Sequence, residues 1–214
     1  LGQWRINRAL AGVLFDANAR SRGDFDRLPR RYRAVATDLE TGEVVVLEGG
    51  DLARAARASM AVPGFFAPVG WVDRILVDGG ISDNLPTRVA RAMGATRVIA
   101  VDVSRPHPTI ESQAPFAVIG RALDLMQEAT QRDTIAPDAL VLPELPSGFS
   151  GTQFPDDPGS LIEIGLTAAR RDLDPSPPYT GRGARPEAEP PDSLAGLVIE
   201  APDSALGALA RRVF

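Results

Sequence analysis

Hydrophobic and polar positions in the first third of the chain alternate first with a strand period and then with a helix period. The stretch "RYRAVATDLETGEVVVLEGG", residues 31–50, holds two β-rich runs on either side of Thr41-Gly42, a turn dipeptide. The next stretch, 50–64, has apolar residues at helical spacing behind Asp51, and Pro63-Gly64 stops the pattern. The sequence therefore predicts a β-hairpin followed by a short helix.

A second group of elements is predicted around the short apolar run "ILVD", residues 75–78. A helix is expected over 85–94, with Asp83 and Asn84 as caps, and an apolar strand over 97–103. Strand, helix and strand in this order are typical of a βαβ unit, and nearly continuous apolar strands favour a parallel sheet covered on both faces. The fold class is therefore predicted to be α/β with a mostly parallel sheet. Three further elements are expected, a helix over 114–134, a strand over 139–145 and a helix over 160–173.

The composition of the chain changes after residue 173, which suggests a domain boundary. Residues 174–193 are rich in proline and charge, as is typical of a linker. Residues 194–214 hold one strand and the start of one helix, too little to fold alone. We therefore expect a main domain over 1–173, a linker, and the truncated beginning of another domain.

Composition and charge exclude several kinds of function. Hydrophobic residues make up 44% and charged residues 24% of the 214 residues, which is ordinary for a globular domain. The formal net charge of −5, without a long basic run, argues against nucleic acid as a partner. The chain has no cysteine and only one histidine, His107, so disulfides, thiolate metal sites and multi-histidine metal centres are excluded. We expect no metal and no organic cofactor.

Asp78 is the residue whose position favours chemistry. It follows the apolar strand directly, and ligands of open α/β sheets gather at the carboxyl ends of strands. Gly79 and Gly80 allow a tight turn and a close approach of other groups. Partial burial would raise the pKa of this carboxylate and suit it to act as a general base. The alternative is a structural Asp-Gly turn, in which the side chain only bonds its own backbone.

Four motifs in order give this aspartate a more specific context. They are "VATDLETGE", "ARASMAVPGFFAPV", "LVDGGISDNLP" and "ARAMGATRVIAVDVS". Together they closely resemble the second half of a bacterial patatin-like phospholipase domain, over roughly residues 25–173. The resemblance implies a three-layer α/β/α fold with a mostly parallel sheet and a lipid acyl hydrolase that uses a Ser-Asp dyad. It makes Asp78 the base of the dyad, with Gly79 and Gly80 completing the Asp-Gly-Gly box, and it dispenses with a catalytic histidine.

The chain departs from this family in lacking a nucleophile. The family presents its serine in a Gly-x-Ser-x-Gly elbow, behind a Gly-rich loop that binds the oxyanion, and neither motif occurs here. The nearest string, "GFSGT" at 148–152, has Thr152 in place of the second glycine, so we reject Ser150 as the nucleophile. We expect His107 to be an uninvolved loop residue. The serine is expected in a missing N-terminal part of the same domain, which would leave the sheet incomplete on that side and these 214 residues inert on their own.

Two further features leave alternatives open. Phe65 and Phe66 could line an acyl-chain pocket or could simply pack in the core. The tail "FPDDPGSLIEIGLTAARRDL" and the segment after it resemble patatin-like proteins that continue into a polypeptide-transport-associated (POTRA) domain and an outer-membrane barrel. That resemblance would place the protein in a bacterial envelope, and otherwise a cytoplasmic hydrolase is expected. The alternative to an enzyme that acts on lipids or other carboxylic esters is an inactive docking or folding module before a transport domain.

Overall fold

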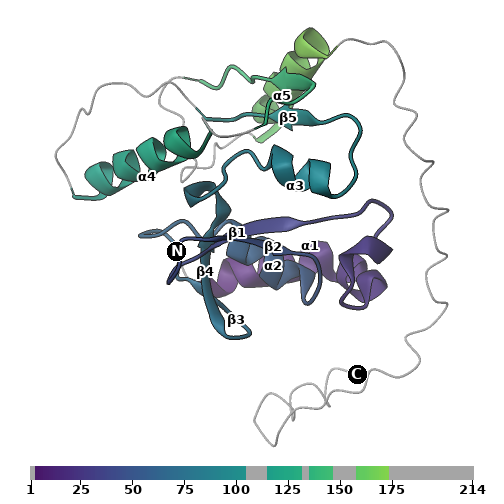
Figure 1. Ribbon diagram of the computed structural model, residues 1–214, viewed down its shortest axis with the longest axis vertical. Coiled ribbons are helices and arrows are strands. Elements are labelled where there is room, and N and C mark those ends of the chain that lie inside the picture. Colours follow the sequence, from purple (N-terminus) through teal and green to yellow (C-terminus); the bar gives the residue numbers. More distant parts are fainter. Residues whose placement is uncertain (1–2, 105–114, 132–134, 147–157, 174–214) are drawn as a thin grey trace, which may run out of the picture.

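The structure is a computed structural model that describes residues 3–104, 115–131, 135–146 and 158–173 (Figure 1). Helices and two β-sheets share this part of the chain, so the α/β class predicted from the sequence is confirmed. The predicted linker at 174–193 and the segment 194–214 lie outside the described residues. The helices and strands are α1 (Gln3–Ser21), η1 (Phe25–Arg27), β1 (Ala34–Asp38), β2 (Val44–Leu47), α2 (Leu52–Ser59), β3 (Val69–Trp71), β4 (Arg74–Asp78), η2 (Gly79–Ile81), α3 (Thr87–Ala92), β5 (Ile99–Val101), α4 (Pro115–Gln131), β6 (Ala139–Val141) and α5 (Pro158–Asp172).

The larger sheet has four strands in the order β2-β1-β4-β3, and every neighbouring pair is antiparallel. The predicted hairpin is its first part, since β1 pairs with β2 from Ala34↔Leu47 to Thr37↔Val44. Gly42 lies in the hairpin turn with a φ of 74°, a conformation that favours glycine. All five residues of β1 are buried, because this strand lies between β2 and β4 and is covered by α2.

The direction of the strands differs from the prediction. We expected a mostly parallel sheet and a βαβ unit running through β4, α3 and β5. Among the described residues only β5 and β6 pair in parallel, whereas β4 pairs antiparallel with both β1 and β3. Leu76 and Val77 are almost completely buried in this antiparallel setting. The continuous apolar run therefore indicated correctly that β4 is buried, but it did not indicate whether the neighbouring strands are parallel or antiparallel.

Helix α2 packs on the larger sheet, and α1 packs against α2 (Figure 1). As predicted, Asp51 caps the helix, and its carboxylate accepts a hydrogen bond of 2.7 Å from the backbone N–H of Arg54. Leu52, Ala55 and Ala58 are buried at a spacing of three residues, so one face of the helix packs on β1 and β4. The main core cluster consists of Phe25, Leu28, Ala34, Ala36, Leu47, Leu52, Ala55, Ala58 and Leu76.

Helix α3 is shorter than the predicted helix and is not capped as expected. Its N-cap position is Pro86, which makes no side-chain capping bond, so Asn84 lies too early in the chain to cap it. The carboxylate of Asp83 accepts instead from the backbone N–H of Leu85, before the helix begins. Gly94 follows the end of the helix with a φ of 88°, in agreement with the prediction.

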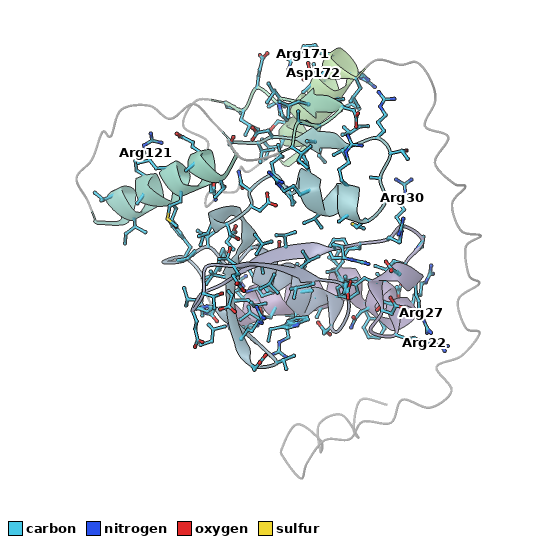
Figure 2. All side chains as sticks on the ribbon, viewed as in Figure 1. Arg22, Arg27, Arg30, Arg121, Arg171 and Asp172 are labelled. Atoms are coloured by element: carbon cyan, nitrogen blue, oxygen red, sulfur yellow. The ribbon has the colours of Figure 1, made fainter. Side chains whose placement is uncertain are left out.

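The last turn of α5 packs against the parallel pair β5–β6 (Figure 2). The carboxylate of Asp172 accepts from the backbone N–H of Leu142 at 3.0 Å, and Arg171 donates to the Leu142 carbonyl at 2.7 Å. These bonds hold the end of α5 against the chain that leaves β6. Ile99 and Val101 on β5 are about half exposed, so the outer surface of this pair is apolar.

Candidate active site

Asp78 is the last residue of β4 and lies at its carboxyl end, as the sequence predicted. Antiparallel pairing sets Asp78 opposite Ala36 of β1, and its backbone N–H donates to the carbonyl of Ala61 at 3.1 Å. The two residues before it, Leu76 and Val77, are buried. The strand therefore fixes the position of Asp78 from both sides, while its side chain remains half-buried at the rim of the sheet.

The carboxylate of Asp78 begins the next turn. Its Oδ1 accepts a hydrogen bond of 2.7 Å from the backbone N–H of Gly80, which makes Asp78 the N-cap of the short helix η2. This is the structural role that we weighed as the alternative to catalysis. It occupies one of the two carboxylate oxygens, and a carboxylate can accept several hydrogen bonds. The same side chain can therefore cap the turn and still take a proton.

Gly79 and Gly80 are required by their surroundings for different reasons. A Cβ on Gly79 would stand 2.3 Å from the carbonyl oxygen of Val35, so the turn packs directly on the backbone of β1. A Cβ on Gly80 would meet only side chains, with Asn84 Oδ1 at 2.7 Å, Gln127 Nε2 at 2.8 Å and Asp78 Oδ1 at 3.0 Å. Gly80 thus leaves room for two polar side chains, those of Asn84 and Gln127, to lie near the carboxylate of Asp78.

Thr37 and Ser82 hold the turn to β1, and sequence reasoning did not identify either of them. The Thr37 hydroxyl donates to the carbonyl of Asp78 at 2.8 Å and lies 2.8 Å from the Ser82 hydroxyl. Since its single proton goes to that carbonyl, the Ser82 hydroxyl is the donor in the second bond. Gln127, from α4, was also missed. Each of these partners is at least 41 residues from the group it meets, so no local signal could have revealed them.

Burial raises the pKa of Asp78 above its usual value, and the N–H of Gly80 opposes this shift only in part. No cation contributes to the shift, and Asp78 is in none of the ion pairs found in the described part of the chain. An aspartate in a salt bridge would be a weaker base. Asp78 therefore has the electrostatic setting of a general base.

The raised pKa predicts how stability depends on pH. Between about pH 4, where Asp78 loses its proton in the unfolded chain, and its higher pKa in the native state, the native state binds more protons, so this group lowers stability as the pH rises. Asp78→Asn cannot ionise, so the variant should gain stability relative to the wild type between pH 3 and pH 7. Urea unfolding midpoints of both proteins at the two pH values test this. If the midpoints of the variant and the wild type differed by the same amount at pH 3 and pH 7, the predicted effect of Asp78 on stability would be wrong.

The two phenylalanines weighed as pocket residues lie just after α2, outside the main core cluster. Phe65 is 42% exposed, and the ring of Phe66 is 4.9 Å from the guanidinium carbon of Arg57. The structure therefore leaves Phe65 available for contact with a ligand, while Phe66 contacts a cation. His107 and Ser150 lie outside the described residues.

The described residues contain no group of three or more His, Cys, Asp or Glu side chains that could hold a metal ion. None of the helices in the described ranges combines the length and the apolar character that a membrane span needs.

Comparison with known proteins gives this geometry a family context. The family model for patatin-like phospholipase matches residues 5–91, a range that includes Asp78, Gly79 and Gly80. Two uncharacterized NTE family proteins of Mycobacterium tuberculosis are similar to this chain. One is 39% identical over 80 residues, which are 37% of this chain and 14% of the relative. The other is 44% identical over 79 residues, again 37% of this chain and 22% of the relative.

A mouse protein, patatin-like phospholipase domain-containing protein 7, is 43% identical over 74 residues, which are 34% of this chain and 6% of that protein. The chain thus spans less than a quarter of the length of these curated relatives. Residues 5–91 are thus similar to the patatin-like phospholipase family, and part of the chain is similar to NTE family proteins.

Proposed function

We propose that this chain supplies the general base of a lipid acyl hydrolase that cleaves carboxylic esters with a Ser-Asp dyad. Asp78 is the base, and the nucleophilic serine comes from sequence that these 214 residues do not include. The single observation that carries the proposal is a half-buried carboxylate, free of any ion pair in the described residues, at the carboxyl end of β4. The match of residues 5–91 to the patatin-like phospholipase family supports the choice of reaction.

In the proposed reaction the serine hydroxyl attacks the ester carbonyl while Asp78 takes its proton. The protonated carboxyl group then gives this proton to the leaving alcohol, and an acyl-enzyme remains. Water then attacks the acyl-enzyme while Asp78 takes its proton, and this proton passes to the serine oxygen as the fatty acid leaves. The bond from Gly80 N–H to Oδ1 holds the carboxylate in one orientation through both steps. Phe65, exposed near the end of α2, is the side chain that we propose for contact with the acyl chain.

The first test uses the chain as it is. Without the serine elbow, the purified 214 residues should hydrolyse 4-nitrophenyl butyrate no faster than the buffer. A longer protein that joins them to a Gly-x-Ser-x-Gly segment should hydrolyse it with burst kinetics, because an acyl-enzyme accumulates. Hydrolysis by the 214 residues alone that disappears in Asp78→Asn would refute the assignment of the nucleophile. A longer natural sequence without any such serine would refute the proposed function.

A further inference from the structure

Arg57 is a buried charge whose compensation is incomplete. It belongs to the last turn of α2, it is only 5% exposed, and its Nη1 has no hydrogen-bond partner. Its Nη2 donates a long hydrogen bond of 3.3 Å to the Ala67 carbonyl, and its guanidinium carbon lies 4.9 Å from the ring centre of Phe66. Burial lowers the pKa of this guanidinium, and no carboxylate offsets the shift. Buried charges in proteins are normally paired, because leaving one unpaired is costly.

Arg57 also lines a cavity of about 540 Å³, which lies between α1, α2 and the segment that leads into β3. Leu14, Phe15 and Val69 form part of an apolar wall, and Asn7 and Arg54 add polar groups. Phe15 is 59% exposed, so its ring is open to contact with a ligand. The volume falls in the range of small-molecule sites, which combine apolar walls with a few polar groups.

The charges that face this cavity are positive on balance. Asp51 supplies the single carboxylate among the lining residues, and both its oxygens are engaged, one by the N–H of Arg54 and the other by the amide of Asn18. Arg54 donates to the carbonyl of Gly70, and its guanidinium carbon is 5.7 Å from the ring centre of Trp71. Two arginines and one aspartate thus line the cavity, and in the described part of the chain neither arginine forms an ion pair.

We propose that this cavity binds a single-chain anionic amphiphile, with its headgroup on Arg57 and its apolar chain along Leu14, Phe15 and Val69. A guanidinium matches the geometry of a carboxylate or a phosphate, and charge-assisted hydrogen bonds of this kind are among the strongest in proteins. Nη1 is shielded from solvent in this structure. To bind the headgroup, the guanidinium therefore has to rotate about the terminal bonds of the side chain. The long bond to Ala67 is a weak restraint on that rotation.

The site is separate from the candidate active site. None of the residues that line the cavity belongs to the turn at 78–84. The inference therefore does not depend on the proposed role of Asp78, and either proposal can fail without the other.

Binding of three ligands with the same chain length, measured by titration calorimetry below their micelle concentrations, tests the proposal. The ligands are dodecanoate, dodecyl phosphate and uncharged dodecanol, each titrated into the 214-residue chain. We expect the better anion to bind at least ~10-fold more tightly than dodecanol. A preference for dodecanoate would identify a fatty acid, and a preference for dodecyl phosphate would identify a phosphate monoester. Both outcomes support the proposal, whereas absence of binding, or equal binding of dodecanol and the anions, overturns it.

Matched variants locate the site. Arg57→Gln should weaken binding of the anion by about 10-fold or more and leave dodecanol unaffected. Arg30→Gln removes the same charge from an exposed residue that lines no part of the cavity (Figure 2), and it should bind like the wild type. If Arg57→Gln fails to fold, Phe15→Ser decides the question, because its exposed ring can be replaced at little cost in stability. Phe15→Ser should weaken the binding of all three ligands. Unchanged affinity in that variant, or unchanged affinity for the anion in a folded Arg57→Gln, would overturn the proposal.

Discussion

Asp78→Asn is expected to lower kcat for ester hydrolysis by about 10²–10⁴-fold in a protein that joins these residues to a Gly-x-Ser-x-Gly elbow. Asparagine has nearly the shape of aspartate, and its Oδ1 can still accept the N–H of Gly80, so the turn should keep its geometry. The amide cannot take a proton at neutral pH, and the serine would lose its base. Burst-phase and steady-state kinetics with 4-nitrophenyl butyrate measure the loss.

Asp83→Asn is the matched control for this experiment. Asp83 lies five residues further along the chain, and burial raises its pKa as well, but its carboxylate accepts from the N–H of Leu85 and interacts with Arg88. Removal of this charge should change kcat by less than about 3-fold if Asp78 alone is the base. A large loss in Asp83→Asn, together with a small one in Asp78→Asn, would move the base from the strand end to the loop that follows it.

The parts of the fold that the sequence predicted well are those fixed by neighbouring residues. The cap of α2 depends on Asp51 and the N–H of Arg54, three residues later. The hairpin turn depends on Gly42, which has a positive φ. Both features depend on residues within a few positions of one another, so the local sequence is enough to predict them.

Strand direction was predicted wrongly because it is set by pairing over long distances. Ala36 of β1 lies opposite Asp78 of β4, and the apolar pattern of either strand would also suit a parallel neighbour. The candidate site divides in the same way. Asp78 and its glycines were visible as a strand end followed by a turn, whereas Thr37 and Gln127 reach them only through packing. The cap of α3 was misplaced because the chain makes one more turn, through Leu85 and Pro86, before the helix begins.

Gly79→Ala is expected to destabilise the native state by about 3 kcal/mol, the upper end of the range for overpacking. The backbone of Gly79 does not have a positive φ, so conformational strain is not the reason. The reason is space, since the new methyl group would stand 2.3 Å from the carbonyl oxygen of Val35 and 2.7 Å from its carbon. Both atoms belong to the backbone at the centre of the larger sheet, and neither can move aside as a flexible side chain would.

Gly12→Ala provides the comparison, and urea unfolding of both variants measures the effect. Gly12 lies inside α1 with no neighbouring atom within 4 Å of a new methyl group, so this change should stabilise the protein by up to about 1 kcal/mol. The same substitution should thus have opposite signs at the two sites. Because Thr37 ties the Asp78 carbonyl to β1, relief of the clash would also move the carboxylate. A Gly79→Ala variant as stable as the wild type would mean that the turn is not packed on β1, and the position of Asp78 would then have to be reassigned.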